Sequence, residues 1–166
     1  MLPTSNPGAR RSWRGLVLVP VVLLAAAALG CSSGSGTPEA SIETGLIQPA
    51  ELATLLQAPA SERPVLLHVG FEPLYHTAAI PGSRYVGPGS KREGIAALGK
   101  ALADLPHDRA IVIYCGCCPW GDCPNMKPAF KAARALGYTN VRALHIAKNF
   151  ETDWTRRGYP TEKPTD

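Results

Sequence analysis

Ala110-Ile-Val-Ile-Tyr114, followed directly by Cys115-Gly-Cys-Cys118, is the stretch that decides the fold of this 166-residue sequence. The apolar run predicts a buried β-strand, and helical spacing begins again after Pro124. Four thiols therefore fall on a strand-to-helix loop: Cys115, Cys117, Cys118 and Cys123. Ligands of α/β sheets bind beyond the carboxyl ends of strands, and N–H groups at a helix start stabilise thiolate. Any chemistry of this protein is expected to be sulfur chemistry at this loop.

Working outward, strand and helix patterns alternate along the chain. Apolar runs predict further short strands over residues 46–48, 65–69, 84–86 and 141–145. Helical spacing predicts helices beginning at Pro49, over 91–105, from about Asn125 to Leu136, and over 150–157. This alternation favours an α/β fold with a mostly parallel sheet covered by helices on both faces.

The first thirty residues indicate an export signal rather than part of the fold. Three arginines precede an apolar run of 14 residues, Leu16 to Leu29, which is too short for a typical transmembrane helix. The Ala28-Leu-Gly-Cys31 sequence then resembles the lipobox of bacterial lipoproteins, and the resemblance implies lipidation of Cys31. Ordinary signal cleavage nearby and an uncleaved anchor are the alternatives.

We expect one domain on a tether. The predicted parts are a signal peptide over 1–30, a flexible linker over 31–43, a domain over 44–160 and a tail over 161–166. Three of the 17 Lys and Arg lie in the signal, leaving 14 against 13 Asp and Glu and a net charge of +1. This balance indicates no nucleic-acid partner. We expect an extracytoplasmic protein of the cell envelope that contacts the membrane through its N-terminal lipid.

Several short motifs, taken in order, resemble the rhodanese family. They are Ile80-Pro-Gly-Ser83, the strand that ends at Cys115, Leu136-Gly-Tyr-Thr-Asn-Val141 and the closing Trp154…Gly158-Tyr-Pro160. The resemblance covers about residues 44–160 and implies a rhodanese-like, mostly parallel sheet with helices on both faces. It also implies that Cys115 carries sulfur as a persulfide, taken from a small sulfur donor such as thiosulfate and passed to a thiol or cyanide acceptor.

We expect the loop amides and the dipole of the following helix to form an anion cradle for Cys115. His68, near the end of the neighbouring strand, would stabilise a thiolate as a cation; a hydrogen-bonded histidine inside the sheet is the alternative. His145 allows the same two interpretations. Asp122 and Asn125 are interpreted as caps of the next helix.

The sequence departs from the family pattern beside the cysteine. Family members usually carry an acidic residue and an arginine where this chain has His68 and Gly70. The loop between Cys115 and Asn125 has no Arg or Lys, and Gly121 stands six residues after the cysteine. The missing arginine excludes the chemistry of the related phosphatases and argues against thiosulfate turnover.

The three further thiols leave other functions open. Cys117, Cys118 and Cys123 could relay sulfur from Cys115 or form a disulfide with it. All four could instead bind a soft metal ion, Cu(I) or Zn(II), although their spacing is not a standard zinc pattern. A non-catalytic binding module is the fourth hypothesis, in which Pro119-Trp120 docks a protein partner rather than merely packing the loop. We predict a rhodanese-like sulfurtransferase or sulfur-relay protein that uses a cysteine persulfide, with no certain cofactor.

Overall fold

The computed structural model describes residues 45–165 of the chain. Helices and strands alternate in the order β1 (Leu46–Ile47), α1 (Pro49–Leu55), β2 (Val65–His68), α2 (Glu72–Thr77), β3 (Arg84–Tyr85), α3 (Arg92–Leu102), β4 (Ile111–Tyr114), α4 (Met126–Ala135), β5 (Val141–Leu144), α5 (Phe150–Asp153) and the 3-10 turn η2 (Thr155–Arg157). The predicted signal peptide over 1–30, the predicted lipidation site Cys31 and the predicted linker over 31–43 lie outside the described residues. Within residues 45–165, no helix has the length and apolar character needed to cross a membrane.

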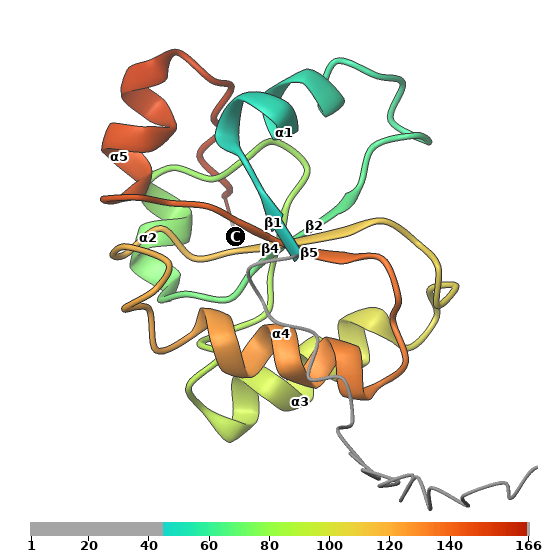
Figure 1. Cartoon of the computed structure of the whole chain (residues 1–166). Helices are drawn as coiled ribbons and strands as arrows, with labels where there is room; N and C mark the ends of the chain where they lie inside the picture. The colour runs from blue at the N-terminus through green and yellow to red at the C-terminus, as the bar shows by residue number, and fades with distance from the viewer. Residues whose placement is uncertain (1–44, 166) are drawn as a thin grey trace, which may run out of the picture. The chain divides into compact units, whose positions relative to one another are not determined.

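The five strands form one parallel sheet in the order β1-β5-β4-β2-β3, drawn in Figure 1. The apolar run over residues 110–114 contains β4, which is buried along its whole length at the centre of the sheet. β2 pairs with β4 from Val65 and Ile111 to His68 and Tyr114, so the two strands end at the same level. The predicted α/β fold with a parallel sheet is confirmed.

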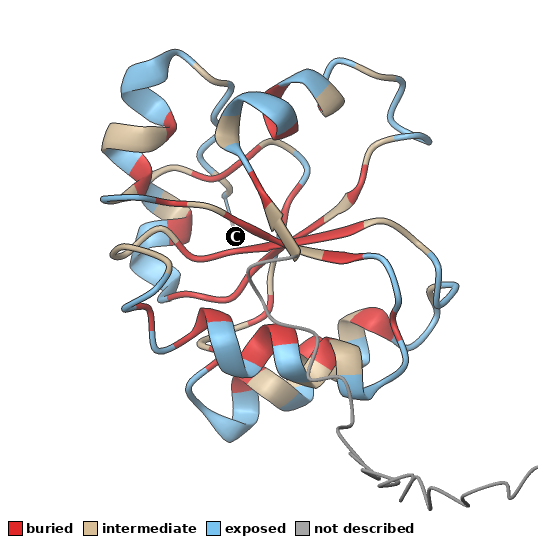
Figure 2. Cartoon of the chain, in the orientation of Figure 1, coloured by how far each residue is buried: buried red, intermediate tan, exposed pale blue. Residues whose placement is uncertain are grey.

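Helices cover both faces of the sheet (Figure 1). Ile111 and Ile113 of β4 pack against α3 and α4 on one face. Val112 and Tyr114 pack against α1 and the fully buried Trp154 on the other. Figure 2 shows the buried residues along the strands and on the helix sides that face them. The side chains of β4 alternate between two cores, and the carboxyl end of the strand leads directly into the cysteine loop.

Two helices differ from the sequence-based expectation. The segment Glu72–Thr77 forms the short helix α2, which the sequence analysis did not predict. Six residues with Pro73 in the first turn carry no repeating apolar pattern that could identify a helix. The helix expected over 150–157 ends at Asp153 and continues as the tighter turn η2, which closes at Gly158 with a left-handed φ of 77°.

The last described residues are tied to the domain. Glu162 pairs antiparallel with Ala79, and the N–H group of each donates to the carbonyl of the other at 2.9 Å. The Glu162 carboxylate also accepts from the N–H of Gly82 at 2.9 Å. Within the segment predicted as a tail, residue 162 therefore has a fixed position.

Candidate active site

Cys115 directly follows β4, at the carboxyl edge of the sheet. The next residue, Gly116, has a φ of 91°, in the left-handed region that favours glycine. A Cβ at this position would lie 2.6 Å from the Cβ of Phe150, so both the backbone and the available space require glycine. The sharp turn at Gly116 brings Cys117 back to the sulfur of Cys115.

The four loop cysteines are free thiols and form one cluster. The Sγ of Cys117 is central: it lies 3.3 Å from that of Cys115, 3.0 Å from that of Cys118 and 3.7 Å from that of Cys123. Cys115 and Cys123 are each 3% exposed, whereas Cys117 and Cys118 are half-buried. The structure thus places two half-buried cysteines beside two buried ones.

Polar contacts to the Cys115 sulfur come from the loop and from the start of α4. The Nδ2 of Asn125 donates to it at 3.6 Å, and the N–H of Cys117 also faces it. On the β2 side, a Cβ at Gly70 would lie only 2.7 Å from the sulfur. Because Gly70 has no Cβ, it leaves the space that the sulfur of Cys115 occupies.

The pKa values of the two buried thiols move in opposite directions. The neighbouring Cys123 sulfur and burial raise the pKa of Cys115 above the ordinary range of a thiol. The facing Cys115 thiol lowers the pKa of Cys123 to about 5 against the effect of burial, with help from the N–H groups of Asn125 and Met126. Burial also raises the pKa of Cys118 to about 12. At neutral pH the buried pair holds one proton on Cys115, and Cys123 is the thiolate.

The loop amides do not form the expected ring around Cys115. Three of them, the N–H groups of Trp120, Asp122 and Cys123, donate to backbone carbonyls instead. These bonds close tight turns and tie the loop to the residues that follow β5. The N–H of Cys117 reaches Cys115, while those at the start of α4 reach Cys123. The predicted helix-start cradle therefore stabilises mainly the second buried thiol.

His68 reaches the backbone of Cys115 and not its thiol. Its Nε2–H donates to the Cys115 carbonyl oxygen at 2.9 Å, while Nδ1 has no partner among the described residues. Its ring packs among those of Tyr75, Tyr85 and Tyr114, with centroids 4.9 to 5.9 Å away. Burial lowers the pKa of His68 to about 4, so the ring is neutral at pH 7. The cationic role is wrong; the histidine holds the backbone that carries the cysteine.

Asn125 is a site residue that the sequence analysis misassigned. We interpreted it as a helix cap, but its side chain caps no N–H group of the described helix α4. Its Oδ1 accepts from the N–H of Ser90 at 3.1 Å, which orients Nδ2 toward Cys115. The one signal in the sequence was an amide placed directly after Cys123-Pro124, at the same helix start as the thiols.

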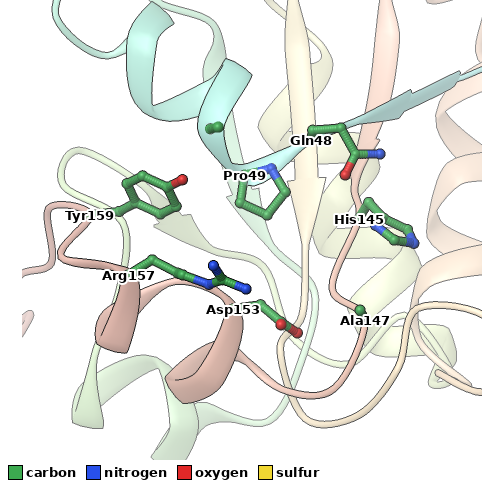
Figure 3. A pocket seen from close by; sticks show the side chains of 8 residues that line it. Gln48, Pro49, His145, Ala147, Asp153, Arg157 and Tyr159 are labelled. Carbon is green, nitrogen blue, oxygen red and sulfur yellow. The ribbon is translucent and has the colours of Figure 1, made fainter.

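His145 and Trp120 lie together. Their ring centroids are 6.2 Å apart, and the Nζ of Lys127 lies 5.9 Å from the centroid of the Trp120 ring. His145 also lines a cavity of about 280 Å³ beyond the carboxyl ends of β1 and β5, together with Asp153 and Arg157, as Figure 3 shows. This histidine faces a cavity whose lining contains none of the described cysteines.

A larger cavity, of about 420 Å³, opens beside Cys115. Its lining comes from the turn Cys115 to Cys117, from α2 and from the beginning of α5. Although only 3% of the Cys115 surface is exposed, the residue forms part of the wall of a space that a small molecule can enter.

No family model matches the chain, and no curated protein matches it. Several solved structures are similar to it. The thiosulfate sulfurtransferase of Pseudomonas aeruginosa is similar over 76% of this chain and 22% of its own, with a TM-score of 0.54 and 24% identity. The rhodanese-like domain of the Alr3790 protein of Anabaena sp. is similar over 72% and 80%, with a TM-score of 0.52 and 21% identity. The single-domain sulfurtransferase RDL2 of Saccharomyces cerevisiae is similar over 68% and 89%, with a TM-score of 0.51 and 19% identity.

Proposed function

Residues 45–165 have a rhodanese-like α/β fold, and from that premise we propose that Cys115 carries a persulfide and passes its outer sulfur to Cys117. One observation carries the proposal. Cys115 directly follows the central strand and lines the 420 Å³ cavity, and its sulfur lies 3.3 Å from that of Cys117. A sulfur donor in the cavity and the receiving thiol of Cys117 would therefore both lie beside Cys115.

Loading begins with a proton transfer. The S–H proton of Cys115 passes to the thiolate of Cys123, whose sulfur lies within 4.8 Å of it. The Cys115 thiolate then attacks the outer sulfur of a donor R–S–SH, forming Cys115–S–SH as the donor S–S bond breaks and R–S⁻ leaves. Asn125 Nδ2 and the N–H of Cys117 are placed to stabilise the negative charge on Cys115.

Relay follows from the position of Cys117. The leaving R–S⁻ takes the proton from Cys123, which then takes the proton of Cys117 across 3.7 Å. The Cys117 thiolate attacks the outer sulfur of Cys115–S–SH, which gives Cys117–S–SH and restores the Cys115 thiolate. No net oxidation occurs, because one S–S bond replaces another. The sulfur thereby moves from a buried residue to a half-buried one, from which a thiol acceptor can take it.

The proposal also includes the location of the protein in the cell. The Ala28-Leu-Gly-Cys31 sequence supports export and lipid attachment at Cys31, which would hold the domain on the outer side of a membrane. A small sulfur donor or thiol acceptor outside the cytoplasm is then the expected partner.

Intact mass spectrometry of the reduced full-length protein tests the proposal after incubation with a low-molecular-weight persulfide. The wild type should gain one sulfur atom, Cys115→Ser should gain none, and Cys123→Ser should load more slowly. Cys117→Ser should load but transfer poorly to an acceptor thiol. Full sulfur uptake by Cys115→Ser would overturn the proposal, and loss of two hydrogens without added sulfur would indicate thiol–disulfide exchange.

Soft-metal binding is a second candidate that one observation favours. The sulfurs of Cys115, Cys117 and Cys123 lie within 4.8 Å of one another, so the cluster could hold a metal ion. Three thiolates suit Cu(I) or Zn(II). Native mass spectrometry should then show one ion that each of these three serine variants loses and Cys118→Ser keeps. A Cys115→Ser variant that retains the ion would exclude this three-sulfur site.

A further inference from the structure

The wall of the 420 Å³ cavity beside Cys115 is largely apolar. Leu74 and Ala78 of the α2 region and Phe150 of α5 supply carbon surface, and Gly116 supplies backbone. Among the described residues that line the cavity, none is Lys, Arg or His. A doubly charged donor such as thiosulfate would therefore lose hydration there without meeting a cation.

Three polar side chains of the wall, those of Thr77, Asn149 and Glu151, already make hydrogen bonds. The hydroxyl of Thr77 donates to the Pro73 carbonyl at 2.7 Å, and the Oδ1 of Asn149 accepts from the N–H of Thr152 at 2.8 Å. The one acidic side chain of the lining, Glu151, accepts from Nε and Nη2 of Arg156 at 3.1 and 2.8 Å. The Arg156 guanidinium is thus paired with the acidic side chain of the lining, and no lining residue carries a positive charge.

The size of the cavity points to an organic ligand. Small-molecule sites in proteins usually enclose about 300 to 1,000 Å³, so this space suits a small organic molecule and leaves an inorganic anion loosely held. Leu74 is 40% exposed, which places an apolar surface at the mouth of the cavity. A ligand with a carbon skeleton would cover that surface.

We propose that the cavity binds the uncharged, partly apolar body of an organic thiol and of its persulfide, and that this thiol pair exchanges sulfur with Cys115. The inference rests on the proposed function. In the exchange, R–S–SH gives its outer sulfur to the Cys115 thiolate and leaves as R–S⁻, which takes up a proton to become R–SH. The reverse step returns the sulfur, so loading and unloading use the same cavity.

A comparison of three donors tests this substrate class on the full-length protein. Benzyl persulfide, glutathione persulfide and thiosulfate are supplied at equal concentration, and the rate of sulfur addition to Cys115 is measured by mass spectrometry. Benzyl persulfide should load at least about tenfold faster than glutathione persulfide, and thiosulfate should be slowest.

A variant with a positive charge in the cavity wall tests the same donor preference. Leu74→Lys should raise the thiosulfate rate and lower the benzyl persulfide rate, because it adds a cation and removes apolar surface. Phe71→Lys is the control: Phe71 is 45% exposed on the same chain segment, adds the same charge and lies outside the cavity lining. It should leave the donor preference unchanged.

The outcomes separate the two proposals. If no donor adds sulfur to Cys115, the proposed function itself fails. Two results would show that the substrate class is wrong while the persulfide function stands. One is a thiosulfate loading rate equal to that of benzyl persulfide. The other is a Leu74→Lys variant with the same donor preference as the Phe71→Lys control.

Discussion

The Nδ2 of Asn125 donates a hydrogen bond to the sulfur of Cys115, while the Oδ1 of the same side chain accepts from the N–H of Ser90. Asn125 is fully buried, so its amide cannot turn away into solvent. The turn before α3 thereby fixes a donor on the sulfur that ends β4. In the proposed function, this amide stabilises the negative charge that develops on Cys115.

Asn125→Asp should slow sulfur loading by about tenfold or more, because a carboxylate in place of the amide repels negative charge on Cys115 while still accepting from Ser90. Single-turnover loading with a persulfide donor measures the effect. Asp122→Ala, an exposed change in the same loop, serves as the control. A loading rate in Asn125→Asp equal to that of the wild type would remove the amide from the mechanism.

The folded protein should lose stability relative to a His68→Gln variant as the pH falls from 6.5 to 4. Burial lowers the pKa of His68 from 6.5 to about 4, so the unfolded chain binds the proton first in this range. The free energy of unfolding therefore rises with pH across the window, by about 3 kcal/mol in total. Urea unfolding of both proteins at several pH values measures this, and parallel pH profiles would contradict it.

Cys123 should be a thiolate at pH 7 in the reduced, metal-free protein. The pKa of Cys123 is about 5, lowered by the facing Cys115 thiol, so the ultraviolet absorbance of thiolate should disappear as the pH falls through that value. Cys123→Ser should lack this low-pH step, and Cys118→Ser should keep it. Titration confined to the region near 9.0, the ordinary thiol pKa, would contradict the assignment.

Gly70→Ala should destabilise the protein by about 1 to 3 kcal/mol, since the new Cβ would lie 2.7 Å from the sulfur of Cys115 and 2.9 Å from Cε1 of His68. In a Cys115→Ala background the loss should shrink by about 1 kcal/mol, because one of the two clashes is gone. Denaturant unfolding of the four proteins in this cycle gives the coupling. Strict additivity would mean that the sulfur does not occupy the space that Gly70 leaves.

Much of the fold follows from the sequence, because apolar runs and helical spacing report burial directly. The run from 110 to 114 predicted the central strand, and the structure places Cys115 directly after that strand, as expected. The helix α2 was not predicted because its six residues, which include Pro73, show no periodic pattern of apolar residues. Its position matters, since Leu74 forms part of the cavity wall.

The polar details of the site were less predictable because they depend on contacts between distant segments. The role of Asn125 needs Ser90, which lies 35 residues earlier. The neutral state of His68 needs its burial among three tyrosines. Spacing alone placed four thiols in one loop, but only the turn at Gly116 and the start of α4 decide which of them holds the proton.

The position of the transferred sulfur during a single turnover tests the central claim most directly. The full-length protein is mixed with a persulfide donor, quenched with an alkylating reagent at increasing times, digested and sequenced by tandem mass spectrometry. The added sulfur should be found first on Cys115 and later on Cys117, with the first species decaying as the second grows. Sulfur that arrives first on Cys117, Cys118 or Cys123, with Cys115 never modified, would contradict the account.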